Sequence, residues 1–215
     1  MDLNFDMITA GLKKSWDVFM ANIVAYLVGF LILFIAGFFS FLIIPLILLA
    51  PLAYGFAYMA IKGLRGDKVE IGDMFIALKS VSLFIRSWMY LIIPFIIFFI
   101  LGICVTLIST VLAQISGALA FIFGLFMFLV YLVLFIVMIP ILFYSIYIYI
   151  MTPSENVIYA YKEGFAVFKA NILMTIVAII VVYIMAIIPI LGAILGGIFT
   201  AYVLKELKPD LRDNS

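Results

Sequence analysis

The chain has 215 residues, of which 69% are hydrophobic and 11% are charged, and its mean hydropathy is +1.44. A soluble domain is about a quarter charged, so this composition excludes an ordinary water-soluble protein. The net charge of +1 gives no sign of a nucleic-acid partner. The absence of histidine removes the commonest general base and the commonest transition-metal ligand, and the single Cys104 excludes a disulfide within the chain. We therefore expect an all-α integral membrane protein with no cofactor and no metal.

Charged residues divide the chain into three apolar stretches. None lies between Asp17 and Lys62, between Arg86 and Glu155, or between Lys169 and Lys205. A membrane span needs about 20 residues, so each stretch is long enough for two spans. The sequence thus predicts six spans, paired as three hairpins: 22–39, 43–62, 88–112, 118–150, 171–188 and 190–205.

Helix-breaking residues near the middle of each stretch favour hairpins over three very long helices. The first stretch has Gly37 and Pro45, the second has the run 114–117 (Gln-Ile-Ser-Gly), and the third has Pro189. Proline removes a backbone donor and disrupts a helix interior. Each break is therefore expected to be the tip of a hairpin.

The basic residues all fall on one side of this predicted topology. All 12 lie before, between or after the hairpins, and none lies at a hairpin tip. Because lysine and arginine concentrate in cytoplasmic loops, we expect both termini in the cytoplasm and the protein in the cell membrane.

An internal repeat precedes two of the hairpins. Residues 13–23 and 162–172 are identical at six of eleven positions at a constant offset of 149. A looser third copy runs from Asp73 to Lys79 and on to Trp88. The chain therefore divides into repeat-like units at about 1–63, 72–150 and 152–205, with a short cytoplasmic tail at 206–215.

The segments that open these units have amphipathic helical periodicity. We expect them to lie in the cytoplasmic interface of the membrane, although they could instead be the cytoplasmic ends of the spanning helices. The run Thr152-Pro153-Ser154-Glu155 predicts a capping box at the start of the last one. Asp73 is predicted to be the N-cap of the helix that follows it.

No group of side chains supports catalysis. The loop 65–73 carries Asp67, Glu70 and Asp73, which could form a metal site but fit a solvated turn better. Neither Cys104 nor any serine in a span has a histidine or lysine base within its span, which argues against a nucleophilic site. Apart from Lys62 and Lys205 at their cytoplasmic ends, the predicted spans contain no ionisable residue other than Cys104 and the tyrosines, and this absence from the membrane interior disfavours an ion-coupled transporter.

The remaining candidate residues are small or uncharged polar residues. Close helix packing is predicted at Gly192, Gly196, Gly197, Ala53 and Ala57, within one subunit or between two, with Ile198 facing lipid. Polar contacts are predicted at Asn22, Asn171 and Gln114. For the two asparagines, helix capping, solvation at the membrane interface, bonding between helices and ligand contact all remain open.

The layout resembles a broad prokaryotic group of multi-pass membrane proteins of unknown function. This group includes the membrane domain of some glycerophosphodiester phosphodiesterases. The similarity lies in the lead segment from Lys13 to Asn22, the hairpin end 51–55 (Pro-Leu-Ala-Tyr-Gly) and the charged turn 65–67. The resemblance implies a membrane domain and carries over no active-site residue.

These observations predict a non-enzymatic protein that acts through helix packing, lipid contact or assembly with partners. Membrane lipid, a second copy of the chain or another membrane protein are the expected partners, and nucleic acid is not. A passive channel or small-solute transporter is the alternative, and a membrane-embedded enzyme is a more distant one.

Overall fold

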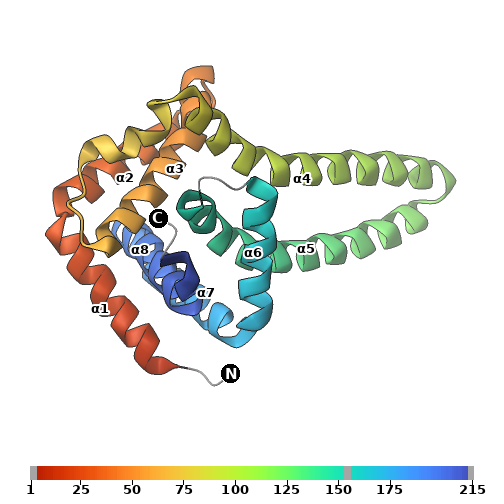
Figure 1. The fold of residues 1–215 in the computed structure, drawn as a ribbon. Helices are drawn as coiled ribbons and strands as arrows, with labels where there is room; N and C mark the ends of the chain where they lie inside the picture. The colour runs from red at the N-terminus through yellow and green to blue at the C-terminus, as the bar shows by residue number, and fades with distance from the viewer. Residues whose placement is uncertain (1–3, 153–155, 213–215) are drawn as a thin grey trace. The chain divides into compact units, whose positions relative to one another are not determined.

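The computed structural model describes residues 4–152 and 156–212, and within them the ordered elements are all helical. Figure 1 shows their arrangement. The elements are α1 (Phe5–Ala21), α2 (Ile23–Phe38), α3 (Ile43–Arg65), η1 (Ile71–Leu78), α4 (Val81–Ile115), α5 (Gly117–Met151), α6 (Val157–Ala170), α7 (Ile172–Met185), α8 (Pro189–Leu207) and η2 (Pro209–Arg212). The predicted all-α class is therefore confirmed.

Four helices are long and apolar enough to cross a membrane, and up to six spans result if each of two bent pairs is counted as one. The four are α3, α4, α5 and α8, and the bent pairs are α1 with α2 and α6 with α7. The axis turns by 92° between α1 and α2 and by 103° between α6 and α7. The axis of α1 therefore does not continue into α2, and the axis of α6 does not continue into α7.

The chain forms two compact units. Unit 1 comprises Met1–Trp88 together with Pro140–Ser215, and unit 2 comprises Met89–Ile139. Unit 2 holds α4 from Met89 to its end, α5 from its start to Ile139, and the break between the two helices at Ser116. At 1.5 Å per residue, helices of 35 residues extend about 50 Å, which exceeds a hydrocarbon core of about 30 Å.

The core of unit 1 lies among α3, α8 and the last turns of α5. The rings of Tyr54 on α3 and Tyr149 on α5 lie 6.5 Å apart, centroid to centroid. The hydroxyl of Tyr147 donates to Gly197 O of α8 at 2.9 Å. Other side chains with almost no exposed surface include Met59, Tyr144, Ile148, Ile194 and Phe199. The second helix of each predicted hairpin thus contributes to this core.

The element that opens each predicted unit packs closely on the second helix of a different hairpin. A Cβ added at Gly55 of α3 would lie 1.8 Å from Met74 O of η1. One added at Gly11 of α1 would lie 2.8 Å from Tyr202 Cδ1 of α8, and one added at Gly164 of α6 would lie 2.9 Å from Ile141 O of α5. The three lead elements α1, η1 and α6 therefore contact α8, α3 and α5 in cyclic order.

Every position buried in the first two helices of the last predicted unit is also buried in the first unit. The buried residues of α6 and α7 are Val157, Ala160, Gly164, Val167, Met174, Thr175 and Ala178. Subtracting the offset of 149 from each gives Ile8, Gly11, Ser15, Val18, Ala25, Tyr26 and Gly29, all of which are buried in α1 and α2. The sequence repeat therefore coincides with one repeated pattern of burial.

Three local predictions are wrong. The third lead element is an eight-residue 3-10 helix, η1, in place of an amphipathic α-helix. Helix α6 begins at Val157 with Asn156 as its N-cap, whose side chain accepts from the Tyr159 N–H at 2.9 Å, so Thr152 is not the cap; residues 153–155 lie outside the described residues. Ile198 is fully buried, because α8 is surrounded by other helices in unit 1.

Candidate functional site

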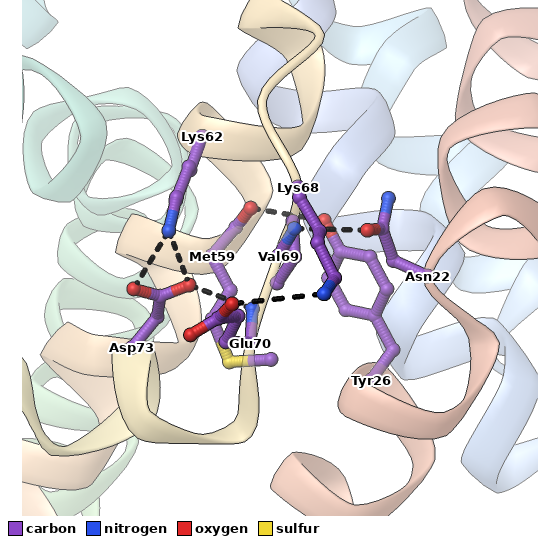
Figure 2. Close-up of polar contacts among 8 residues, drawn as sticks. All are labelled: Asn22, Tyr26, Met59, Lys62, Lys68, Val69, Glu70 and Asp73. Atoms are coloured by element: carbon purple, nitrogen blue, oxygen red, sulfur yellow. Dashed lines mark hydrogen bonds and ion pairs between the residues drawn. The ribbon is translucent and has the colours of Figure 1, made fainter.

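Asn22 forms the bend between α1 and α2. Its Nδ2 donates to Val18 O at 3.1 Å and its backbone N–H donates to Phe19 O at 3.1 Å, so it satisfies carbonyls at the open end of α1. Its Oδ1 accepts from the Val69 N–H at 2.9 Å (Figure 2). One amide side chain thus ends α1 and also fixes the loop that leads into η1.

A largely buried ion pair joins Lys62 of α3 to Asp73 of η1, on either side of this loop. Lys62 Nζ lies 2.9 and 2.8 Å from the two carboxylate oxygens of Asp73, and the side chains are 23% and 12% exposed. Asp73 Oδ2 also accepts from the Glu70 N–H at 2.8 Å (Figure 2). The carboxylate of Asp73 therefore has partners on both oxygens and is not an open position for a substrate or metal.

Asp73 caps η1 differently from the prediction. The N-cap is Glu70, and Asp73 is three residues further on, where its side chain bonds back to the Glu70 N–H while the Glu70 side chain accepts from the Asp73 N–H. This reciprocal pair is a capping box. The prediction was wrong because η1 begins three residues earlier than expected. Lys68 makes only a long, exposed ion pair with Glu70, at 3.8 Å.

A buried tyrosine connects α2 to α3 beside this network. Tyr26 is fully buried, and its hydroxyl donates to Met59 O at 2.9 Å (Figure 2). A Cβ added at Gly63 would lie 2.6 Å from this hydroxyl oxygen, so the ring fits only because position 63 is glycine. The charged loop, the bend at Asn22 and the α2–α3 contact therefore form one connected polar cluster.

The second bend uses Asn171 in the same way. Its Nδ2 donates to Val167 O at 3.1 Å. At the offset of 149, Asn171 corresponds to Asn22 and Val167 corresponds to Val18, so the two hydrogen bonds are equivalent. Four residues later, Thr175 Oγ1 accepts from the Tyr144 hydroxyl at 3.3 Å. Of the interpretations left open for the two asparagines, helix capping is the one that both geometries display.

Small residues predicted to mediate packing line the α7–α8 turn and the core. A Cβ at Gly192 would lie 1.8 Å from Met185 O, and one at Gly196 would lie 3.0 Å from Val182 Cγ1. Gly197 accepts the Tyr147 hydrogen bond on its carbonyl. Ala57 is buried and Ala53 is half-buried, both on α3. These contacts are all within one chain.

Gln114 and Cys104 belong to unit 2, where both are exposed on α4. In the same region, Thr106 and Thr110 donate to carbonyls four residues earlier in α4, at 2.9 and 2.8 Å. Across the described residues, no three His, Cys, Asp or Glu side chains group as metal ligands would.

Arg86 is recognisable in the sequence only as a basic charge, but the structure gives its guanidinium specific partners. Its Nη2 donates to Tyr149 O at 2.7 Å and to Thr152 O at 2.8 Å, and its guanidinium lies 4.0 Å from the centroid of the Tyr149 ring. It therefore caps the carbonyl end of α5. The available signal was a lone arginine at the start of a long apolar run.

Comparison with known proteins adds no further assignment. No family model, curated protein or solved structure matches the chain. The resemblance to the membrane domain of glycerophosphodiester phosphodiesterases stays a prediction.

Proposed function

We propose that this chain is a non-enzymatic, multi-pass protein of the cell membrane that acts through helix packing and contact with lipid or partner membrane proteins. It crosses the membrane six times as three hairpins, each in a repeat-like unit, and its termini are cytoplasmic. In this arrangement α1 and α6 lie in the cytoplasmic interface, since they turn away from α2 and α7 by 92° and 103°.

One observation carries the proposal: several hydroxyl side chains of the helices bond to the backbone of their own helix, whereas the exposed surface of α4 and α5 is mostly apolar. Ser15, Thr106 and Thr200 each donate to a carbonyl of their own helix. In the most apolar windows of α4 and α5, only 6% and 0% of the residues are buried. Such helices need an apolar medium, which lipid or another membrane helix supplies. A hydroxyl that donates to its own backbone has no proton left to donate to a solute.

Flux through reconstituted vesicles tests the proposal against a passive channel or transporter. We expect vesicles containing the purified chain to release a small dye and alkali cations no faster than empty vesicles. We also expect no change in internal pH under an imposed solute gradient, because coupling needs a titrating or ion-binding group within the spans. A leak that a single substitution within a span abolishes would overturn the proposal in favour of a pore.

Photocrosslinking tests the positive part of the proposal. A photoreactive phenylalanine analogue in place of Phe126, which is 59% exposed on α5, should crosslink to lipid or to another protein in intact membranes. The same analogue in place of Phe199, which is fully buried, should crosslink only within the chain. Equal external crosslinking at both positions would contradict the proposed packing.

A further inference from the structure

A cavity of about 250 Å³ lies in unit 1 among α3, η1, the start of α4 and the end of α5. Its walls are mostly apolar and include Ile61, Leu83 and Met151. The volume is below the range of about 300–1,000 Å³ typical of pockets for drug-sized ligands. It suits a narrow apolar group, such as part of an acyl chain, better than a bulky polar molecule.

The cavity has a cation at its edge. Arg65, the last residue of α3, lines it and is exposed, and it forms no ion pair with any residue in the described part of the chain. Lys62, one turn earlier, is neutralised by Asp73. Arginine presents several N–H donors in a plane and suits phosphate oxygens. Tyr58 also lines the cavity.

At the wall formed by the end of α5, two backbone carbonyls are capped by an arginine. Ile150 and Met151 line the cavity, and the nearby carbonyls of Tyr149 and Thr152 accept from Arg86. Arg86 therefore offsets the negative potential of this helix end. Another cavity, of about 400 Å³, is lined by the acidic residues Asp6 and Glu206. Its charge is opposite to that of the cavity beside Arg65, so it does not suit an anion.

We propose that the cavity beside Arg65 binds one anionic phospholipid. An acyl chain lies against Ile61, Leu83 and Met151, and the phosphate binds the Arg65 guanidinium. This site deepens the proposed function, on which it rests, by naming one class of lipid and the place where it binds. Charge complementarity selects an anionic lipid over a zwitterionic one.

Native mass spectrometry of the purified, delipidated full chain tests the site. The chain is offered equimolar phosphatidylglycerol and phosphatidylcholine in detergent, and retained lipids are counted. We expect one phosphatidylglycerol per chain to be retained in preference. Arg65→Gln should reduce that preference about tenfold, since it removes a charge-assisted bond. Lys79→Gln removes an exposed cation outside the cavity lining and should leave the preference unchanged.

Further arms distinguish the alternatives. Leu83→Trp fills the cavity and should abolish retention of that lipid; if this variant does not stay monodisperse, the comparison of Arg65→Gln with Lys79→Gln decides. Wild-type preference in Arg65→Gln, or an equal loss in Lys79→Gln, would overturn the site. Displacement of the lipid by millimolar glycerol 3-phosphate would assign the cavity to a soluble phosphate instead.

The failure of this site is distinguishable from the failure of the proposed function. Alkaline carbonate extraction of native membranes reports membrane integration independently of lipid selectivity. A chain that stays in the membrane but shows no selectivity loses only the lipid site. A chain that carbonate extracts loses the proposed membrane role as well.

Discussion

Replacement of Gly55 by alanine should destabilise the protein, because no space exists for a Cβ at this position. The added atom would lie 1.8 Å from Met74 O and 2.5 Å from the Met74 carbonyl carbon. Ordinary contact begins near 3.4 Å, so the η1 backbone must retreat by about 1.6 Å. Met74 follows Asp73, so this movement also strains the ion pair with Lys62, whose shorter bond is 2.8 Å.

The expected net cost is about 2 kcal/mol. Overpacking of a close contact costs about 1–3 kcal/mol, and a backbone obstacle that cannot rotate away puts this site at the upper end. Alanine in a helix interior recovers about 1 kcal/mol relative to glycine. For a chain of this size, a shift of roughly 2–4 °C per kcal/mol predicts an apparent Tm lower by roughly 4–8 °C.

Thermal stability in detergent, followed by size-exclusion chromatography of heated samples, measures this effect. Gly124→Ala is the matched control, because Gly124 lies within α5 with nothing within 4 Å of an added Cβ. It should be as stable as the unaltered protein or slightly more stable. If Gly55→Ala melts at or above the temperature of Gly124→Ala, the close packing of η1 on α3 is refuted.

Three further outcomes are expected. Asp73→Asn and Lys62→Met should each destabilise the protein by about 1–3 kcal/mol, because each change leaves the largely buried partner without its ion pair. The double variant should be destabilised by less than the sum of the two single effects. Strict additivity in the same melting assay would show that the pair contributes nothing. Gly196→Leu should separate α7 from α8 and lower the Tm, whereas Ala193→Leu, at an exposed position of α8, should not; equal Tm values would contradict this packing. In a Cys104→Ala background, single cysteines near residues 40 and 116 should react with an impermeant reagent applied to intact cells, and one at the C-terminus should not; external labelling of the C-terminus would disprove the topology.

The sequence by itself determined the all-helical class and the positions of the apolar helices. Charges are so costly in hydrocarbon that their absence delimits the apolar helices, and breakers such as Pro189 separate them. The predicted span 43–62 corresponds to α3 at Ile43–Arg65, and 118–150 corresponds to α5 at Gly117–Met151. The offset of 149 likewise anticipated the equivalence of Asn22 and Asn171, since a repeat is visible wherever both copies keep the same residues.

Helix ends and polar partners were less accessible from the sequence. Asp73 precedes an apolar run and therefore has the appearance of an N-cap, but the capping residue is Glu70, because η1 begins earlier and is wound as a 3-10 helix. The partner of Asp73, Lys62, lies eleven residues away on α3, and nothing in the local pattern pairs them. Arg86 was visible only as a charge, because its acceptors lie 63 and 66 residues along the chain.

Only the tertiary structure decided which small residues are indispensable and which apolar faces are buried. Periodicity cannot separate a lipid-facing isoleucine from a buried one in a chain that is apolar on every side, and Ile198 was therefore assigned to lipid although it lies in the core. Gly55, Gly11 and Gly164 were not distinguished from other glycines, because the atoms that exclude a Cβ belong to distant segments. In a membrane protein, hydrophobicity determines which segments enter the lipid, whereas close packing determines which helices contact one another. These contacts join residues far apart in the sequence, so local sequence patterns do not predict them.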